Sequence, residues 1–430
     1  MKERIAIIEG FRTPMGKAGG CLKNVSAHDL GAKVVKELLV RTDIDPNIID
    51  EVIIGNVANL SDSANIARVI ALKAGIPESV PAFTVHRNCA SGMESVTSAA
   101  NRILLGDADV IIAGGVESMS NIPLLYNSKM TKLFADLFKS RSFLQKLKVI
   151  FRFRPNFLSP VIAVQQGLTD PISGLIMGST AENLARDFRI TRKEKDEYAM
   201  QSHNRAEKAT AEGVFDDEIV TIFNNDVKNS KIIENDEGIR NGQNMKDLSK
   251  LKPYFERNTG TVTVGNSSQL TDAGAAMILM SESKAKELKL KPLGYLRDFA
   301  YAGLDPSRMG LGPVFAAAKL LKKSDVKFKD IDLIEINEAF AAQVIACKKA
   351  FESDEFAKKE LGLESAIGKI DDEILNVNGG GISLGHPVGM SGSRIIIHAL
   401  KELKRKKKKM ALTTLCIGGG QGGACLLEAK

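Results

Sequence analysis

The stretch Asp50-Glu51-Val52-Ile53-Ile54-Gly55-Asn56 is a strand-like run that ends in a glycine-marked turn. A second stretch, Asp332-Leu333-Ile334-Glu335-Ile336-Asn337, repeats this pattern far along the chain. Two further pairs of segments match in the same order: Cys89-x-x-Gly92-Met93 with His386-x-x-Gly389-Met390, and Ala113-Gly114-Gly115 with Cys416-Ile417-Gly418. Three matches in one order indicate an internal duplication, in which Cys89, His386 and Cys416 converge where equivalent helix and strand ends meet.

The residues around these segments predict an α/β fold. Strand-like runs alternate with helical patterns, as in a sheet with helices on its faces: the runs lie at 5–8, 50–54 and 109–113, the helical patterns at 27–39, 65–74 and 91–105. From residue 121 to about 264 helices and polar turns replace this alternation, which returns at 275–280. Since one core stops growing near ~250–300 residues, we expect two α/β halves with an inserted segment.

Composition excludes several classes of protein. Apolar residues make up 44% of the 430 residues and charged residues 26%, which excludes a disordered, collagenous or coiled-coil chain. No apolar run approaches the ~18 residues of a membrane span, and the first strand-like run starts at Ile5, too early for a signal peptide. Five cysteines without a C-x-x-C pair favour reduced thiols in a cytoplasmic enzyme over a disulfide framework or a zinc site.

The formal charge of +7 is concentrated in one window. Between Tyr126 and Phe157 the only acidic residue is Asp136, against eight basic ones: Lys129, Lys132, Lys139, Arg141, Lys146, Lys148, Arg152 and Arg154. Interleaved leucines and phenylalanines predict a pair of basic amphipathic helices, whose role as a solvated face, a contact with a partner subunit or a contact with anionic lipid stays open. Nucleic acid is disfavoured because no aromatic stacking platform accompanies the charges. A second basic run, Lys404 to Lys409, is expected between a helix and a strand.

Two residues are candidates for a nucleophile and its base. Cys89 lies where a helical pattern begins, so free amides and the helix dipole are expected to lower the pKa of its thiol and to form an oxyanion hole. The alternative is a buried cysteine that serves only as a small hydrophobe. His386 sits in a glycine-rich loop, 378–392, that lets backbone approach a ligand, and Pro387, expected in the first helical turn, would fix its aim.

Two more candidates lie at strand ends. Cys416 ends the strand-like run 410–415 within a glycine loop, where a thiol suits proton transfer beside a substrate. The dinucleotide spacing Gly418-x-Gly420-x-x-Gly423 is rejected, because the chain ends at Lys430 without a crossover helix or a ribose-binding acid. Asn337 ends the run 331–336 and is either a site residue or the N-cap of the next helix.

These motifs together resemble the thiolase family over essentially the full length of the chain. The segments that carry the resemblance are 88–94 around Cys89, the turn Asn337-Glu338-Ala339-Phe340, the Gly385-His386-Pro387 loop, the loop Cys416-Ile417-Gly418-Gly419-Gly420 and residues 260–268. The resemblance implies a doubled five-layered α/β/α/β/α core, with residues 1–120 and 270–291 as the N-terminal half, 121–269 as an inserted loop domain and 292–430 as the C-terminal half. It also implies no metal and no permanently bound cofactor, with coenzyme A as co-substrate.

The resemblance further implies a role for each site residue. Cys89, activated by His386, would attack the 3-keto carbon of a 3-ketoacyl-CoA, and Cys416 would give and take the second proton. His386 and a water held by Asn337 would form one oxyanion hole, and the N–H groups of Cys89 and Gly418 the other. Ser268 and Met177 match positions that contact the pantetheine of CoA.

Within the family, the chain is most similar to the β-subunit of the fatty-acid oxidation trifunctional enzyme and its bacterial counterparts, through residues 152–160, 196–203 and the basic window. This implies degradative cleavage of 3-ketoacyl-CoA, a homodimer or higher homo-oligomer, an α-subunit with hydratase and dehydrogenase activities, and peripheral membrane contact through 126–157. Ile176 precedes Met177 where the acetoacetyl-CoA branch has a histidine, so an acetyl-CoA acetyltransferase, also in the condensing direction, is the weaker alternative. A decarboxylating ketosynthase is disfavoured because it has a histidine in place of Asn337, and a non-catalytic scaffold or membrane-docking subunit would have no use for the reactive residues.

Overall fold

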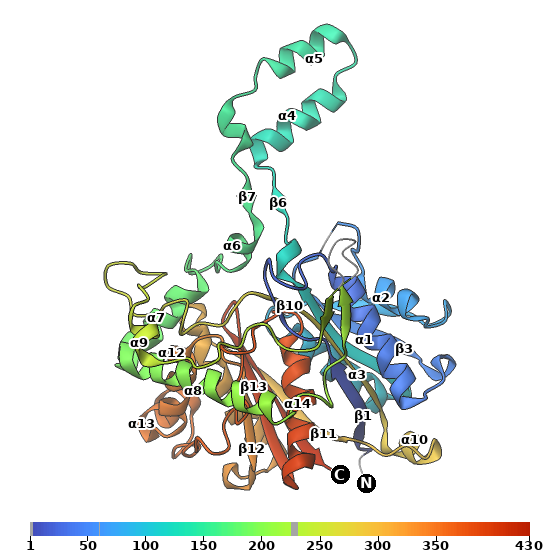
Figure 1. Ribbon diagram of the computed structural model, residues 1–430, viewed down its shortest axis with the longest axis vertical. Coiled ribbons are helices and arrows are strands. Elements are labelled where there is room, and N and C mark those ends of the chain that lie inside the picture. Colours follow the sequence, from blue (N-terminus) through green and yellow to red (C-terminus); the bar gives the residue numbers. More distant parts are fainter. Residues whose placement is uncertain (1–2, 60, 225–230) are drawn as a thin grey trace.

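A sheet of ten strands runs through the computed structural model, which describes residues 3–59, 61–224 and 231–430 (Figure 1). The strand order is β12-β13-β14-β11-β1-β10-β5-β3-β4, with the short β2 (Gly16–Lys17) paired to β10. β1 (Ile5–Arg12) and β11 (Gly294–Gly303) meet at the centre as an antiparallel pair and join the two halves of the sheet.

The first half confirms the predicted alternation. Its strands are β3 (Glu51–Gly55), β4 (Ala82–Val85), β5 (Val110–Ser118) and β10 (Thr271–Ser281); its helices are α1 (Ala27–Thr42), α2 (Ile66–Ala74), α3 (Ser91–Leu105) and α10 (Glu282–Glu287). The parallel strand β3 is buried along its whole length, as its continuous apolar run predicts. α1 begins where the Ser26 side chain accepts from the Asp29 N–H, and α3 ends at Gly106, whose left-handed backbone suits glycine. β10, although it follows the inserted segment, pairs between β1 and β5.

The second half repeats this plan. Its strands are β11, β12 (Leu333–Ile336), β13 (Met410–Ile417) and β14 (Gln421–Ala429); its helices are α11 (Gly312–Ser324), α12 (Ala341–Phe351), α13 (Asp354–Phe356) and α14 (Ser391–Lys406). β12 runs parallel to β13, as β3 runs parallel to β5. The first three residues of the basic run Lys404 to Lys409 form the last turn of α14, so only its second part links helix to strand.

The elements stack as α/β/α/β/α layers. α1 and α2 cover the outer face of the first half, α11 covers the second, and α3 and α14 pack between them, where their buried residues share one core with both halves (Figure 1). Close approach between the starts of α3 and α14 requires small residues: a Cβ on Gly92 would lie 2.9 Å from the Gly389 carbonyl oxygen, and a Cβ on Gly392 would collide with the Met93 N–H. The two matching segments of the duplication therefore touch.

The chain between β5 and β10 covers one end of this core. It contains β6 (Leu124–Leu125), α4 (Ser128–Lys139), α5 (Phe143–Ile150), β7 (Val161–Ile162), α6 (Ala163–Gly167), α7 (Met177–Asp187), α8 (Arg192–Ala211), β8 (Ile222–Asn224), β9 (Lys231–Ile233) and α9 (Met245–Ser249). α4 and α5 form a helical hairpin that β6 and β7 hold away from the body (Figure 1), which confirms the predicted pair of amphipathic helices. Among the helices described, none is long and apolar enough to cross a membrane.

Candidate active site

Cys89 lies two residues before α3, as the sequence predicts. The preceding Asn88 has a left-handed backbone, with φ of 45°, and its side-chain amide donates to the Gly418 carbonyl oxygen at 2.8 Å. The N–H groups of Gly418 and of Cys89 itself hydrogen-bond the Cys89 thiol. The loop after β13 and the start of α3 therefore converge on this sulfur from opposite halves of the molecule.

The expectation of a lowered pKa at Cys89 was wrong for this state of the site. Burial raises the pKa of the thiol, the two backbone N–H groups oppose this, and the nearby Glu117 carboxylate adds to the rise. A helix N-terminus stabilises a thiolate only within its first turn and by a modest amount, which desolvation exceeds here. Formation of the thiolate therefore needs a base.

His386 is buried and has a defined tautomer. Its Nδ1 lies 2.6 Å from the Ser391 Oγ, and the hydroxyl of Ser391 donates its proton to the Pro387 carbonyl oxygen at 3.0 Å. Because that hydroxyl has no second proton, Nδ1 must carry the hydrogen, which leaves Nε2 as the acceptor. Burial, aided by Arg394, lowers the pKa of His386 to about 4. The ring is therefore neutral near pH 7 and able to take a proton at Nε2. Pro387 lies in a turn ahead of α14. The expectation that it would lie in the first turn of that helix was wrong.

Asn337 lies beside this nitrogen. It follows β12, its N–H donates to the Thr414 carbonyl oxygen on β13 at 3.0 Å, and its side-chain Nδ2 is 3.4 Å from His386 Nε2. Its Oδ1 is buried and has no hydrogen-bond partner among the described residues. The N-cap of α12 is Phe340, so the capping role considered for Asn337 was wrong. A buried amide oxygen without a protein partner suits a molecule that enters the site.

Cys416 is buried at the end of β13, next to Cys89. Burial raises the pKa of its thiol well above the ordinary value, and the neighbouring Cys89 and Cys347 add to the rise. After it the chain turns through Gly419 and Gly420, both with positive φ, and pairs back as β14. The glycines therefore lie in a tight hairpin between antiparallel strands and not ahead of a crossover helix.

The remaining predicted residues lie around these groups. Met177 is the first residue of α7, and its sulfur is 3.5 Å from the position that a Cβ on Gly418 would occupy. Ser268 is half-buried and its N–H donates to the Ala339 carbonyl oxygen at 2.9 Å, two residues after Asn337. The structure thus gathers Cys89, Cys416, Gly418 and Met177 in one group and His386, Asn337 and Ser268 in another. The two groups meet because β12 pairs with β13 and Gly389 packs on Gly92.

Comparison with known proteins decides the family. The chain matches the thiolase N-terminal domain over residues 5–283 and the thiolase C-terminal domain over residues 290–429. The chain belongs to the thiolase family. It is therefore an acyltransferase with the thiolase fold, as its sequence motifs predict.

Individual thiolases are similar over their full length. The 3-ketoacyl-CoA thiolase of Pectobacterium carotovorum is 41% identical over 99% of this chain and 97% of its own length, and that of Serratia proteamaculans is 40% identical over 100% and 97%. Among solved structures, an acetyl-CoA acetyltransferase of Bacillus anthracis superposes with a TM-score of 0.88 at 39% identity, over 100% of this chain and 99% of that one. Human mitochondrial 3-ketoacyl-CoA thiolase superposes with a TM-score of 0.86 at 36% identity, again over 100% and 99%.

Sequence reasoning missed the residues that hold the thiolase loops in place. Ser391 fixes the tautomer of His386, as described above. The Glu338 carboxylate accepts hydrogen bonds from α8, where Tyr198 and Ser202 donate at 2.9 and 2.7 Å, and from the 376–383 segment, where Asn376 Nδ2 and the Ile382 N–H donate at 3.0 and 3.2 Å. The signal was present, since Glu338 sits beside Asn337 in the motif, but a motif does not say which distant donors a carboxylate meets.

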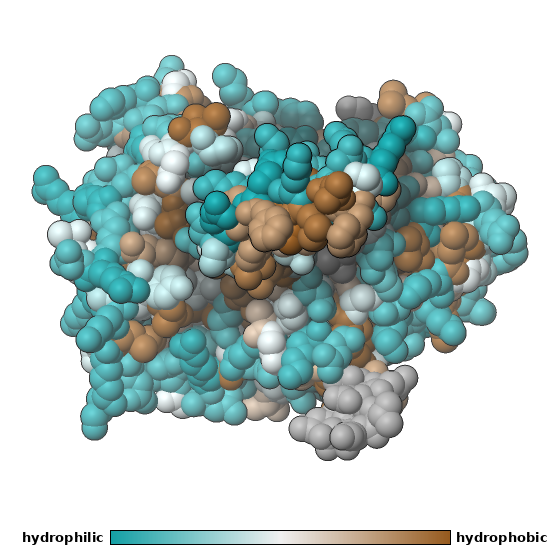
Figure 2. All heavy atoms as spheres, turned by 90° about the horizontal axis from the view of Figure 1, so that it is seen from above, coloured by the Kyte–Doolittle hydropathy of each residue, from teal (hydrophilic) through white to brown (hydrophobic). Residues whose placement is uncertain are grey.

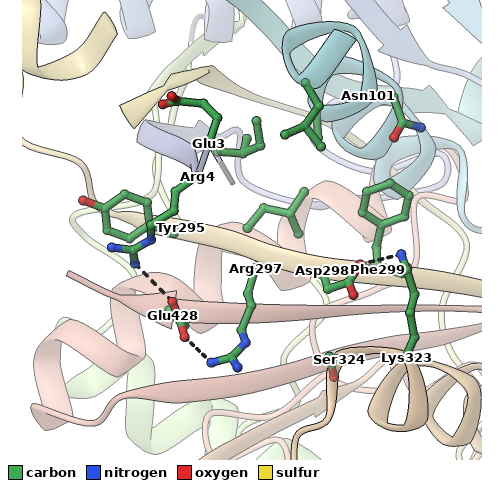
Figure 3. A pocket seen from close by; sticks show the side chains of 14 residues that line it. Glu3, Arg4, Asn101, Tyr295, Arg297, Asp298, Phe299, Lys323, Ser324 and Glu428 are labelled. Atoms are coloured by element: carbon green, nitrogen blue, oxygen red, sulfur yellow. Dashed lines mark hydrogen bonds and ion pairs between the residues drawn. The ribbon is translucent and has the colours of Figure 1, made fainter. Parts of the chain in front are cut away.

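A separate cavity of about 500 Å³ lies far from this site (Figure 3). The end of α3 lines it, whereas Cys89 precedes the start of that 15-residue helix, roughly 20 Å away at 1.5 Å per residue. Its cations are paired within the wall: Arg4 and Arg297 with Glu428 at 3.1 and 2.5 Å, and Lys323 with Asp298 at 2.6 Å. The cavity therefore offers little charge to a ligand, and the catalytic residues of this thiolase lie elsewhere.

Proposed function

We propose that this thiolase cleaves 3-ketoacyl-CoA with free CoA, giving acetyl-CoA and an acyl-CoA two carbons shorter, through an acyl thioester on Cys89. The assignment rests on the position of the Cys89 sulfur. The N–H groups of Gly418 and of Cys89 itself hydrogen-bond this sulfur, and the thiol of Cys416 lies beside it. Thiolysis needs a nucleophile and a separate proton carrier at adjacent points.

The first half-reaction uses both thiols. His386 Nε2 takes the proton of the Cys89 thiol, and the sulfur attacks the C3 carbonyl carbon. The C2–C3 bond then breaks, so C3 stays on Cys89 as the acyl thioester and C2 leaves as the enolate of acetyl-CoA, which takes the proton of Cys416. The buried, neutral Cys416 thiol suits this step, because burial keeps the proton on it until an anion forms nearby.

The second half-reaction returns each proton. The thiol of the incoming CoA passes its proton to the Cys416 thiolate, and the CoA sulfur attacks the acyl thioester. Cys89 leaves as thiolate and regains its proton from His386. Two donor pairs stabilise the oxyanions in this scheme: His386 with a water held by Asn337, and the N–H groups of Cys89 and Gly418. Ser268 and Met177 are proposed to contact the pantetheine arm of CoA.

Acetyl-CoA acetyltransferase activity is the second candidate, because acetyl-CoA acetyltransferases of Bacillus anthracis and Syntrophomonas wolfei superpose on the chain with TM-scores of 0.88 and 0.86. Ile176, the N-cap residue of α7, argues against a dedicated short-chain enzyme, since the acetoacetyl-CoA branch has a histidine there. The deciding experiment measures CoA-dependent cleavage of 3-ketoacyl-CoAs from four to sixteen carbons. We expect kcat/KM to rise with chain length beyond acetoacetyl-CoA. A preference for acetoacetyl-CoA would favour the second candidate.

We further propose that the chain works as a homo-oligomer. β4 lies at one edge of the large sheet, opposite β12, and its four residues are half-buried and carry no charge. Natural edge strands without charges, proline or cover are exceptional, because they pair with other strands. Cys89 follows this edge by four residues, so a second copy at β4 would border the site. Sedimentation of the purified chain tests this proposal, and a monomer at micromolar concentration would contradict it.

The helical hairpin of α4 and α5 is proposed to dock on an anionic lipid surface. Its own small core of Met130, Leu133 and Val149 leaves large apolar side chains in solvent: Phe138, Phe143 and Phe151 are 94%, 73% and 76% exposed. Seen from above, apolar side chains form one patch with hydrophilic side chains around it (Figure 2).

The charges of the hairpin complement such a surface. All eight basic residues of the 126–157 window are exposed, and within the described chain only Arg152 among them forms an ion pair, with Asp136 at 2.8 Å. Basic residues near an anionic membrane contribute about 1 kcal/mol each, and the exposed phenylalanines suit the boundary between headgroups and acyl chains. An α-subunit with an acidic groove is the competing partner.

The test replaces Lys139, Arg141, Lys146 and Lys148 with Gln and measures sedimentation with vesicles of phosphatidylglycerol or phosphatidylcholine. A matched control replaces Lys404, Lys406, Lys407 and Lys409, which are also exposed and lie in the last turn of α14 and just after it. We expect the wild type and the control to bind phosphatidylglycerol only, the hairpin variant to bind neither, and thiolase activity in solution to be equal in all three. Equal vesicle binding by the hairpin variant would overturn the proposal, and loss of a co-purifying α-subunit in that variant would favour the protein partner.

A further inference from the structure

Glu117 joins the His386 loop of the second half to residues 56–58 of the first half. It lies near the end of β5 and is buried. Its Oε2 accepts from the Gly389 N–H at 2.9 Å, three residues after His386, and from the Val57 N–H at 3.2 Å. Its Oε1 accepts from the Ala58 N–H at 3.1 Å and from Asn56 Nδ2 at 3.0 Å. Four N–H groups thus meet one carboxylate, and none of them is an acceptor.

Gly389 lies close in sequence to His386 and packs against the helix that follows Cys89. The Gly389 carbonyl oxygen packs against Gly92, in the first turn of the helix that follows Cys89, and against Gly115 on β5. A side chain at Gly389 would meet the Glu117 carboxylate at 2.9 Å and the Val116 carbonyl oxygen at 2.6 Å. The carboxylate therefore holds the His386 loop at a fixed distance from the start of α3.

We propose that Glu117 is a positioning residue of the thiolase reaction, which holds the His386 loop in register with Cys89 through the Gly389 N–H. The inference rests on the proposed function only for its kinetic readout. As an anion Glu117 satisfies all four donors, whereas its protonated form would turn an O–H toward an N–H and loosen the loop. Positioning errors of about 1 Å are worth on the order of 10²-fold in rate.

The charge state of Glu117 also has a measurable signature. Burial raises the pKa of Glu117 to about 7, and the backbone N–H groups oppose the rise. Its negative charge in turn raises the pKa of the Cys89 thiol. Titratable or charged groups on the elements packed against β5 include Glu51 on β3, Asp272 on β10, Asp29 on α1, Glu94 on α3 and Arg394 on α14, and His386 lies on the loop that Glu117 contacts.

The experiment compares Glu117→Gln with the wild type and with Glu51→Gln, a control at the opposite end of the neighbouring strand β3. Glu51 is also buried and its pKa is also raised by burial. In Glu117→Gln we expect kcat to fall about 10²-fold with KM for CoA unchanged, and the acid limb that the raised pKa of Glu117 predicts for the wild type near pH 7 to disappear. The rate of Cys89 alkylation by iodoacetamide depends on pH through the thiol, and the midpoint of this dependence should shift to lower pH because the neighbouring charge is gone.

Alkylation does not need turnover, so it separates the two proposals. If the wild type cleaves no ketoacyl-CoA while the Cys89 midpoint shifts, the proposed function fails and the contact with Glu117 stands. If kcat and the acid limb both match the control, Glu117 is not a positioning residue, whatever the Cys89 midpoint does. A loss of activity equal to the loss of folded protein by circular dichroism would likewise overturn the proposal.

Discussion

At the scale of single residues, the structure separates the two thiols by environment. Cys89 has two backbone N–H groups on its sulfur, whereas Cys416 is fully enclosed. Cys89→Ser should therefore abolish turnover and remove the most reactive site for iodoacetamide, with folding intact. Peptide mapping after labelling checks this, with Cys347→Ser as the control because Cys347 is buried in the core of the second half. Retained turnover in Cys89→Ser would exclude Cys89 as the acyl carrier.

The other two catalytic candidates are distinguished by which half-reaction they serve. His386→Ala should slow acylation of Cys89 by on the order of 10²–10⁴-fold, the usual span for a lost base or oxyanion donor. Cys416→Ala should still allow Cys89 to be acylated by a simple acyl-CoA but should not break the C2–C3 bond. Mass spectrometry of the acyl-enzyme measures the first effect and release of acetyl-CoA the second. Cleavage by Cys416→Ala at the wild-type rate would mean that another group moves the proton.

The positions of these residues could be predicted from the sequence, but their environments could not. Cys89 before a helix, Cys416 in a glycine turn and Asn337 after a strand follow from local patterns. The pKa of Cys89 does not, because desolvation depends on side chains brought in from both halves of the chain. The same holds for Ser391, whose hydroxyl acts on His386 only once the turn at Pro387 has formed.

At the scale of elements, α8 is attached to the catalytic turn by one buried carboxylate. Glu338→Gln would replace an acceptor with a donor where Tyr198, Ser202 and the Ile382 N–H all donate. We expect the free energy of unfolding to fall by about 1–3 kcal/mol, the usual penalty for an unsatisfied buried group. Urea denaturation measures this. Glu197→Gln on the exposed side of α8 is the control, since its side chain is 48% exposed. Equal midpoints for the two variants would contradict the expectation.

Element boundaries were predictable where periodicity is strong. Helices at 27–39, 65–74 and 91–105 appear as α1, α2 and α3 with ends shifted by no more than three residues. The pairing of β10 between β1 and β5 was not visible in any local pattern, because about 150 residues separate it from β5 and its partners are chosen by long-range packing. The division into halves and an inserted domain therefore stays a proposal, which limited proteolysis can test.

At the scale of the whole molecule, one buried network joins the first half, the inserted segment and the second half. Arg12 on β1 donates from Nε to Glu218 at 2.7 Å and from Nη1 and Nη2 to Asp236 at 2.7 and 2.9 Å. His398 on α14 places its Nδ1 2.9 Å from the other Glu218 oxygen, and its Nε2 lies 3.1 Å from the Asn378 amide at the start of the glycine-rich loop. Charged groups this deep are tolerated because each has its partner.

This network makes the stability of the fold depend on pH in a known direction. Burial lowers the pKa of His398, but the Glu218 carboxylate outweighs it, so the folded-state pKa lies above the ordinary value of about 6.5. A raised pKa means that the ion pair stabilises the fold fully below the unfolded-state pKa and that this contribution is lost as pH rises through the folded-state value.

His398→Gln should therefore be less stable than the wild type at pH 6, with a difference that shrinks toward pH 9. Urea midpoints at several pH values measure this, with His86→Gln, at an exposed position after β4, as the control. A difference that is constant across the range would mean that His398 is neutral in the folded protein and that Arg12 alone neutralises Glu218.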